Sequence, residues 1–289
     1  MRLTRVYVEA ALTPGSAVDL PPETGSHLAK VLRARSGDEL ILFNGDGREF
    51  GGSIEEVRGS RVSAFVGDAR AVDRESPLAI TLVQCVPRGD RMDFIVQKAT
   101  ELGVARIVPV LSQRSVVRLD AAQAQSKANH WRAVTVSACE QCGRNRLPII
   151  ETVQPLLNYL GNSAPSAGPR LVFEPESGSQ PEPGPQAESG SRPESGSQPE
   201  PGLQAESAPQ QHAAAHQWPP AAALNGGWAK VSVADAHVAI GPEGGFTSDE
   251  LEAFRVCGYS QGGLGPRVLR TETAAIAAVV WLQARFGDM

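Results

Sequence analysis

Two glycine-rich segments near the end of the chain have the composition of ligand-binding loops. The first, GPEGGF, runs from Gly241 to Phe246 and directly follows the apolar stretch His237–Ile240. The second, GGLGPRVLRTET, runs from Gly262 to Thr273. Ligands of open α/β sheets bind beyond the carboxyl ends of the strands, where glycine allows the backbone to approach the ligand closely. The two segments therefore predict a binding site, although either one alone could be a tight turn between a strand and a helix.

Neither segment has the spacing of a classical phosphate-binding motif. Neither matches G-x-G-x-x-G followed by an acidic residue about 20 positions later, and neither matches G-x-x-x-x-G-K-[ST]. A classical nucleotide-binding site is therefore disfavoured.

The elements that must position these loops alternate between strands and helices from Pro77 onward. Apolar strands are expected at 78–86, 106–111, 171–173 and 237–240, and helices at 93–102, at 121–142, from 248 and at 272–286. The helix after the first loop begins with a capping box, Thr247 to Glu250, and the helices at 93–102 and 121–142 stop at glycines 103 and 143. Continuous apolar strands that alternate with helices indicate an α/β fold, with a parallel sheet covered on both faces.

Residues 1–75 instead have the pattern of an all-β region. Short apolar or alternating runs at 6–8, 39–43 and 62–66 are separated by turn signals such as Asn44-Gly45-Asp46-Gly47. Short strands at this spacing suggest a small barrel. One helical turn is expected from His27 to Arg33, with Ser26 as its N-cap.

A polar, repetitive segment interrupts the second half of the chain. The block ESGSQPEPGPQA, which starts at Glu176, recurs almost unchanged 18 residues later from Glu194. Proline, glycine, serine, glutamine and glutamate dominate it, so it has few apolar side chains to offset the entropy of ordering. We expect a disordered insertion at about 175–225, most simply an expanded surface loop, with a partner-recruiting role as the alternative.

The formal net charge of −5 conceals two regions of opposite charge. Residues 174–211 hold seven Glu and one Arg, whereas residues 88–146 hold ten Lys or Arg against five Asp or Glu. Because charge acts locally, the basic region can bind a polyanion although the whole chain is acidic.

Composition restricts the class of protein further. Hydrophobic residues at 41% and charged residues at 20% are typical of a chain that folds around a core. The charged start of the chain lacks the pattern of a signal peptide, and no apolar run approaches the ~18 residues of a membrane span. Four scattered cysteines do not suggest a disulfide framework. A cytoplasmic, reduced protein with no membrane segment is expected.

Five motifs of the chain stand out in order: PRGDRMDF at 87–94, QKATELG at 97–103, ACEQCGRNR at 138–146, GPEGGFTSDE at 241–250 and LGPRVLRTETA at 264–274. Together they resemble the motifs of the RsmE family, the 16S rRNA (uracil-N3)-methyltransferases of the SPOUT superfamily. The resemblance covers nearly the whole chain outside the insertion. It implies a PUA-like RNA-binding β-barrel at 1–73 and, at 76–286, a SPOUT α/β domain whose chain forms a deep trefoil knot.

The same resemblance implies S-adenosylmethionine as the cofactor, 16S rRNA or the small ribosomal subunit as the partner, and a homodimer. The resemblance places the cofactor site at both glycine-rich loops and at a third loop that begins with the strand at 171–173. The implied cofactor-binding residues are Leu171, Phe173, Gly241, Pro242, Glu243, Gly244, Gly245, Leu264, Gly265, Val268, Leu269, Arg270, Thr273 and Ala274. The insertion opens at Glu174, where relatives have a short polar turn, so this chain departs from the family at the third loop.

The implied reaction assigns a task to three charged side chains. Uracil N3 is a poor nucleophile until its proton leaves, and negative charge then spreads onto the two flanking carbonyl oxygens. Because cations beside those oxygens stabilise the transition state, Arg267 and Arg270 are the candidate catalytic residues, with Glu272 as a base or orienting group. In the alternative interpretation one of these two arginines binds a phosphate group of the RNA, and Glu272 only interacts with the helix dipole.

The basic region supplies the candidate RNA contacts, because phosphate neutralisation requires a cluster of cations. The candidates there are Arg88, Arg91, Arg114, Arg118, Arg144 and Arg146, together with Glu140 and Gln141. A second patch is expected on the helical turn of the barrel, from His27, Lys30 and Arg33.

Cys139 and Cys142 form a C-x-x-C pair at the end of a predicted helix. A structural zinc site needs a second pair of ligands, and none has suitable spacing. A redox pair would be expected at the beginning of a helix. We therefore interpret the two cysteines as packing residues and expect no metal.

Two other functions are compatible with these residues. A SPOUT methyltransferase acting on a different rRNA or tRNA nucleotide would bind the same cofactor. A non-catalytic RNA-binding assembly factor would keep the basic region and lack affinity for the cofactor. Without the resemblance, the residues indicate only an α/β ligand-binding enzyme with a polyanion-binding module.

Overall fold

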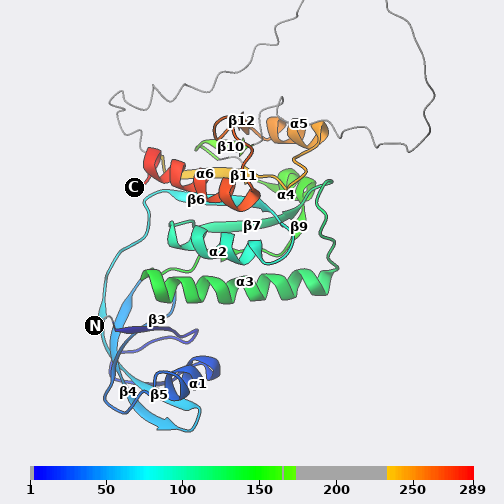
Figure 1. Ribbon diagram of the computed structural model, residues 1–289. Coiled ribbons are helices and arrows are strands. Elements are labelled where there is room, and N and C mark those ends of the chain that lie inside the picture. The colour runs from blue at the N-terminus through cyan, green and yellow to red at the C-terminus, as the bar shows by residue number, and fades with distance from the viewer. Residues whose placement is uncertain (1–2, 165, 174–232) are drawn as a thin grey trace, which may run out of the picture. The chain divides into compact units, whose positions relative to one another are not determined.

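The computed structural model describes residues 3–164, 166–173 and 233–289 (Figure 1). The insertion predicted at about 175–225 lies outside the described residues.

The N-terminal residues form a five-stranded sheet. In chain order its strands are β1 (Thr4–Tyr7), β2 (Ala17–Asp19), β3 (Glu39–Phe43), β4 (Glu49–Arg58) and β5 (Arg61–Arg70). Their spatial order is β1-β3-β4-β5-β2, with β1 and β3 parallel and the other neighbours antiparallel. Val62, Ala64 and Val66 of β5 are buried together with Leu40 and Leu42 of β3, because alternate side chains of a strand share one face.

The helix α1 (Pro22–Lys30) packs on β5 and begins earlier than predicted. Its N-cap is Pro21, not Ser26, and no side chain caps it. Proline in the first helical position costs little, because its missing N–H is one that a helix start leaves unpaired. The helix carries His27 in its last turn, whereas Arg33, at φ +53°, follows the helix and is not part of it.

A second sheet of seven strands forms the core of the remaining chain (Figure 1). Its strands are β6 (Ala79–Cys85), β7 (Arg106–Leu111), β8 (Ile149–Ile150), β9 (Gln154–Pro155), β10 (Arg170–Phe173), β11 (Asp235–Ile240) and β12 (Ser260–Gly262). The spatial order is β12-β10-β11-β6-β7-β8, and β9 also pairs with β7. All these pairings are parallel, as the alternating pattern predicts.

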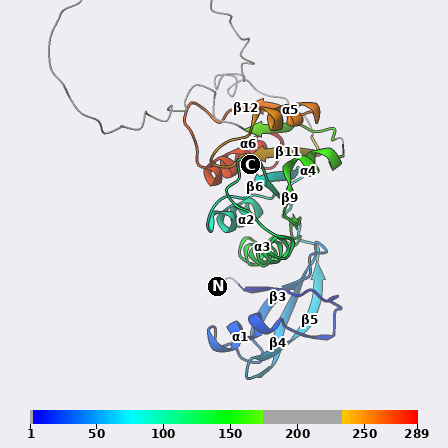
Figure 2. The same cartoon turned by 90° about the vertical axis from the view of Figure 1, so that its right-hand side faces the viewer.

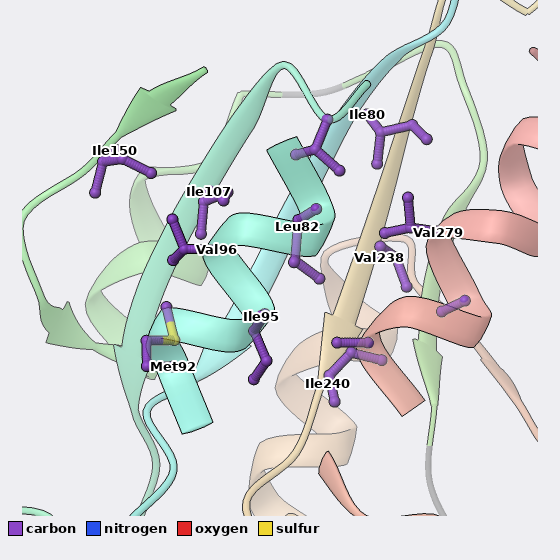
Figure 3. Packing of buried hydrophobic residues seen from close by; sticks show 14 of the residues in the cluster. Ile80, Leu82, Met92, Ile95, Val96, Ile107, Ile150, Val238, Ile240 and Val279 are labelled. Atoms are coloured by element: carbon purple, nitrogen blue, oxygen red, sulfur yellow. The ribbon is translucent and has the colours of Figure 1, made fainter. Parts of the chain in front are cut away.

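Helices cover both faces of this sheet (Figure 2). On one face lie α2 (Arg91–Glu101) and α6 (Thr271–Phe286), and on the other lie α4 (Leu156–Asn162) and α5 (Ser248–Val256). The strand β6 is apolar on both sides for this reason. Ile80 and Leu82 belong to the cluster with α2 and α6 (Figure 3), whereas Val83 and Cys85 belong to the cluster with α4 and α5.

The helix α3 (Ala121–Cys142) packs on α2 and has a strong cap at each end. Asp120 and Gln123 form a capping box, and Gly143 ends the helix at φ +96°. The capping box predicted from Thr247 to Glu250 forms at the start of α5. Among the helices of the described residues, none combines the length and the hydropathy that a membrane crossing requires.

Several elements are not among the predicted ones. They are β2, β4, β8, β9, β12 and α4. The strands β8, β9 and β12 have only two or three residues each, which is too few to display a hydrophobic period.

Candidate functional site

The carboxyl ends of four neighbouring strands lie level with one another. The pairing register places Phe173 of β10 opposite both Gly262 of β12 and Ile240 of β11, and places Ile240 opposite Gln84 of β6. Adjacent strands are about 4.8 Å apart, so these residues form one row across the sheet. Both glycine-rich loops therefore begin at the same edge of the sheet.

The 241–247 loop turns sharply between β11 and α5. Gly245 has φ +67°, and its N–H donates to the carbonyl oxygen of Pro242 at 3.0 Å. A positive φ of this kind is readily available only to glycine, which explains the residue at this position. Glu243 and Gly244 are exposed, so the backbone of this turn is open to a ligand.

Arg114 braces this loop from the segment that follows β7. Its Nη1 donates to the carbonyl oxygens of Gly244 at 3.0 Å and of Phe246 at 3.2 Å. Sequence reasoning assigned Arg114 to RNA, and in the structure its guanidinium contacts the glycine-rich loop.

Glu250 holds the other end of the same loop. This carboxylate is 1% exposed and accepts the backbone N–H of Gln113 at 2.7 Å and that of Thr247 at 2.9 Å. The capping box of α5 therefore also fastens the segment after β7 to the start of the helix.

The 263–270 loop presents both apolar and cationic side chains. Gly265 has φ +91°, and Val268 is 61% exposed. Arg267 and Arg270 are exposed on either side of Val268, and Arg270 is the N-cap residue of α6. The two candidate catalytic arginines therefore lie on the open part of this loop.

Gln84, a residue that sequence reasoning missed, connects the start of α6 to both strand ends beside it. Its Nε2 donates to the carbonyl oxygen of Cys85 at 2.8 Å and to Oγ1 of Thr271 at 3.0 Å. Thr271 Oγ1 in turn donates to the carbonyl oxygen of Gly241 at 2.9 Å. Gln84 Oε1 is buried and has no hydrogen-bond partner among the residues that the structure describes.

Arg91, at the start of α2, lies between acidic residues of the two loop regions. Its Nη1 donates to Oε1 of Glu243 at 2.6 Å, and its Nε lies 3.8 Å from Oε1 of Glu272. The other carboxylate oxygen of Glu272, Oε2, is buried with no hydrogen-bond partner in the described part of the chain.

Four of the remaining predicted cofactor residues belong to the core cluster of β6, α2 and α6 or pack against it. Leu171 and Phe173 are buried and belong to the cluster of β6, α2 and α6. Leu264 and Ala274 are partly buried and pack against this cluster, whereas Leu269 is half-buried and Thr273 is exposed.

The predicted RNA contacts differ in what their side chains do. Arg118 is exposed, and its Nη1 donates to the carbonyl oxygen of Ser115 at 2.6 Å. Glu140 is half-buried, accepts the backbone N–H of Tyr7 at 3.0 Å, and has its pKa raised by burial. The other exposed candidates are His27, Lys30, Arg33, Arg88, Gln141 and Arg146.

Arg144 is 5% exposed, which corrects its prediction as an RNA contact. Its Nε and Nη2 donate to Oε2 of Glu75 at 2.9 and 2.7 Å, and its Nη1 donates to the carbonyl oxygens of Thr100 and Val104. A guanidinium engaged in this way cannot contact phosphate without breaking the interior. Summed charge along the basic region therefore overstates the charge that its surface offers.

Cys139 and Cys142 are free thiols at the end of α3. A hydrogen bond between them lowers the pKa of Cys142 to about 6, while that hydrogen bond and burial raise the pKa of Cys139. The buried thiol of Cys139 also lies 3.6 Å from the carbonyl oxygen of Arg146. Among the described residues, no three His, Cys, Asp or Glu side chains are placed to hold a metal ion.

A cavity of about 580 Å³ lies at the opposite, amino ends of the strands. Thr81, Arg106 and His237, from the early parts of β6, β7 and β11, line it together with Tyr159 of α4. Burial lowers the pKa of His237. Because this cavity opens at the other edge of the sheet, it is separate from the site of the glycine-rich loops.

Comparison with protein families identifies both parts of the chain. Residues 74–192 and 208–283 match the family described as RNA methyltransferase domain, and residues 20–66 match the family described as RNA methyltransferase PUA domain.

Named relatives match over nearly their full length. The chain is 27% identical to ribosomal RNA small subunit methyltransferase E of Buchnera aphidicola subsp. Schizaphis graminum, with 100% of this chain and 98% of the relative covered. It is 29% identical to the protein of the same name from Bacillus subtilis, with 96% and 93% covered.

Two solved structures match over the full length of both chains. A methyltransferase from Legionella pneumophila, in complex with the bound cofactor SAM, is 34% identical with a TM-score of 0.78, and 100% of each chain is covered. Ribosomal RNA small subunit methyltransferase E from Neisseria gonorrhoeae, bound to S-adenosyl methionine, is 30% identical with a TM-score of 0.74 and the same coverage. Since a domain family matches most of the chain and a relative at this identity matches all of it, the chain belongs to the RsmE family of ribosomal RNA methyltransferases.

Proposed function

We propose that this chain transfers the methyl group of S-adenosylmethionine to N3 of a specific uridine in the 16S rRNA of the small ribosomal subunit. The observation that carries the proposal is the level row of strand ends from which both glycine-rich loops start, in a chain that matches a cofactor-bound ribosomal RNA small subunit methyltransferase E over its full length. The RsmE family resemblance supplies the N3 position of uracil.

The residues at this edge fit S-adenosylmethionine. Gln84 Oε1 and Glu272 Oε2 are buried acceptors with no donor among the described residues. A buried acceptor without a donor costs about 1–3 kcal/mol, so a ligand that brings donors stabilises this edge. S-adenosylmethionine carries an ammonium group, ribose hydroxyls, an adenine amine and a positive sulfur, and it therefore matches a set of orphaned acceptors.

The backbones of the 241–247 and 263–270 loops would hold this cofactor, with Leu171 and Phe173 below them and Thr273 and Ala274 at the start of α6. When bound, S-adenosylmethionine supplies an electrophilic methyl group, so the protein contributes binding and orientation. Glycine at 241, 244, 245 and 265 leaves the loop backbones free of side chains that would obstruct a ligand.

The charged residues beside the loops act on the uracil. Glu272, whose side chain is 17% exposed, is the proposed acceptor of the N3 proton. Arg267 and Arg270 are proposed to face the two carbonyl oxygens that flank N3, where they would stabilise the charge that develops as the proton leaves.

RNA is proposed to lie over those cations of the basic region that are not buried. Arg88, Arg91, Arg118 and Arg146 are candidates for phosphate contacts there, and His27, Lys30 and Arg33 are candidates on and after α1. Arg144 is left out because it is buried. Arg114 is assigned first to the 241–247 loop because it contacts that loop.

The family resemblance also supports several features of the whole protein. We propose an RNA-binding domain at 1–73, a methyltransferase domain at 76–286 interrupted at about 175–225, a trefoil knot around the cofactor loops, a homodimer and a cytoplasmic location.

Two measurements test the function. Calorimetry of the purified chain with S-adenosylmethionine should give saturable heat, and no heat would favour the RNA-binding assembly factor. Mass spectrometry of 16S rRNA from a strain that lacks its own enzyme should detect N3-methyluridine only after this chain is supplied. Cofactor binding without restored N3-methyluridine would favour a methyltransferase for another nucleotide.

A further inference from the structure

The buried amide of Gln84 joins three segments that border the proposed cofactor site: the end of β6, the start of α6 and the end of β11. We propose that Gln84 and Thr271 are positioning residues, which fix the carbonyl oxygen of Gly241 and the start of α6, and that Gln84 Oε1 accepts a hydrogen bond from the bound cofactor. This inference deepens the proposed function and rests on it.

Hydrogen-bond chemistry fixes the orientation of the Gln84 amide. A carbonyl oxygen can only accept a hydrogen bond, so the hydroxyl of Thr271 must donate its single proton to the carbonyl oxygen of Gly241. Thr271 Oγ1 can then only accept from Gln84, which requires the NH2 group of the amide on that side. The carbonyl oxygen of Cys85 requires the same NH2 group. The flipped amide would place Oε1 against two acceptors, so the observed orientation is the only satisfied one.

This orientation leaves Oε1 without a donor at the edge where the loops begin. Gln84 is fully buried and stands in the row of strand ends, directly opposite Ile240. Ile80 and Leu82, at alternate positions of β6, face α2 and α6, so Gln84 lies on that face beneath the start of α6. Buried acceptors in folded proteins are nearly always paired. The missing donor is therefore supplied by the ligand of this edge.

The hydrogen bonds from Gln84 to Thr271 and from Thr271 to Gly241 form a relay, which explains how one residue can affect two loops. Thr271 follows the 263–270 loop directly, and Gly241 is the first residue of the 241–247 loop. A hydrogen bond between them sets the spacing of the two loops, and Gln84 prevents the hydroxyl of Thr271 from turning away. Losing the relay should therefore loosen the loops before any cofactor is present.

The test compares variants that differ by one hydrogen-bonding group. Thr271→Val keeps the shape and removes the hydroxyl, Thr271→Ser keeps the hydroxyl, and Gln84→Met or Gln84→Leu removes both the relay and the acceptor. Calorimetry with S-adenosylmethionine should give a Kd about tenfold weaker for Thr271→Val, near the original for Thr271→Ser, and about a further tenfold weaker for the Gln84 variants.

Hydrogen exchange in the absence of cofactor gives a second readout. The amides of the 241–247 loop should exchange faster in Thr271→Val than in Thr271→Ser. In methylation assays KM for the cofactor should rise in Thr271→Val by a larger factor than kcat falls, because the hydrogen bonds of Thr271 fix the cofactor loops directly and affect Glu272 only through the start of α6. Thr135→Val is the matched control, since it removes another buried threonine hydroxyl, in α3, and should leave cofactor affinity unchanged.

Each result decides part of the proposal. If Thr271→Val binds as tightly as the unchanged protein, the relay is wrong while the function stands. If the Gln84 variants, with melting temperatures near the original, bind no more weakly than Thr271→Val, Oε1 is not a cofactor contact. If the unchanged protein itself binds no S-adenosylmethionine, the proposed function fails first, and the relay fails with it.

Discussion

Arg114 donates to the carbonyl oxygen of Gly244 at 3.0 Å, so a side chain from the segment after β7 supports the loop that follows β11. These two strands are not neighbours, because β6 lies between them in the sheet. The contact therefore spans the carboxyl edge and fixes the loop at a point that the strands themselves cannot control.

Removing this brace should weaken cofactor binding more than RNA binding. We expect Arg114→Ala to raise the Kd for S-adenosylmethionine by about three- to tenfold, the cost of one or two hydrogen bonds to the loop. Arg118→Ala is the control, since Arg118 donates to Ser115 and not to the loop. Calorimetry with the cofactor and filter binding with 16S rRNA separate the two effects. An unchanged cofactor Kd together with weaker RNA binding would show that Arg114 contacts RNA and does not support the cofactor loop.

Glu250, the third residue of α5, should matter for stability because its carboxylate is buried. Its buried carboxylate accepts two backbone N–H groups, those of Gln113 and Thr247. Glu250→Ala leaves both donors unpaired, and we expect a loss of about 2–4 kcal/mol in the free energy of unfolding. Glu250→Gln keeps one acceptor and should lose about half as much. Urea denaturation measures both values, and equal losses for Ala and Gln would show that the oxygen retained in Glu250→Gln makes no stabilising hydrogen bond.

The sequence predicts those parts of this site that depend on local signals. The strand at Arg106–Leu111, the capping box at Thr247 and the glycines of both loops are each recognisable within a few residues. Steric preference and hydrogen bonding to the nearest backbone determine such features, so no knowledge of the tertiary structure is needed.

The parts that depend on strand register are not visible in the sequence. Gln84 and Thr271 are 187 positions apart, and they meet only because β6 and β11 pair with Gln84 opposite Ile240. A glutamine near the end of a mostly apolar strand is a signal that could have directed attention to Gln84. The error over Arg144 has the same origin, because its partner Glu75 is 69 positions away.

Acid should destabilise the protein partly through Glu49. Burial alone would raise the pKa of Glu49, but hydrogen bonds from Arg74 and Arg5 outweigh burial and lower the pKa from its ordinary value of 4.5. A carboxyl whose pKa is lower in the folded chain contributes stability above its unfolded pKa and loses it as the pH falls through the folded value. The free energy of unfolding should therefore decline below about pH 4.5.

The variant Glu49→Gln tests this assignment. It should be less stable at pH 7 by about 3–5 kcal/mol, because Arg5 loses its buried carboxylate partner, and its stability should fall less steeply below pH 4.5. Glu252→Gln is the control, since Glu252 has a lowered pKa in an exposed pair with Arg255 and should change little. If the free energy of unfolding fell equally steeply with decreasing pH in Glu49→Gln and in the unchanged protein, Glu49 would not be a cause of the acid destabilisation.

Arg91 and Arg144 should respond differently to substitution, although the sequence groups them together. Arg91 is paired with Glu243 at the surface, a pair worth about 0–1 kcal/mol, so it can be released to phosphate. We expect Arg91→Ala to keep its fold. The slope of the logarithm of the RNA-binding constant against the logarithm of the salt concentration should become smaller by about one. Arg144→Ala removes both donors to Oε2 of Glu75 and the buried donor shared by the carbonyl oxygens of Thr100 and Val104, and it should lower the melting temperature markedly. A stable Arg144→Ala with weaker RNA binding would contradict this division.

Arg267 and Arg270 should act on the chemical step more than on RNA affinity. Both are exposed on the 263–270 loop beside the proposed cofactor site, and a cation aimed at a developing oxyanion is worth about 10²–10³ in kcat. We therefore expect Arg267→Ala and Arg270→Ala to lower kcat at saturating RNA and cofactor by about that factor in at least one of the two variants. Arg88→Ala, at an exposed arginine outside the loop, is the control and should raise KM for RNA with little change in kcat. If kcat survives in both loop variants while RNA binding weakens, the two arginines grip phosphate, and the charge on the uracil oxygens must be stabilised by backbone N–H groups of the same loop.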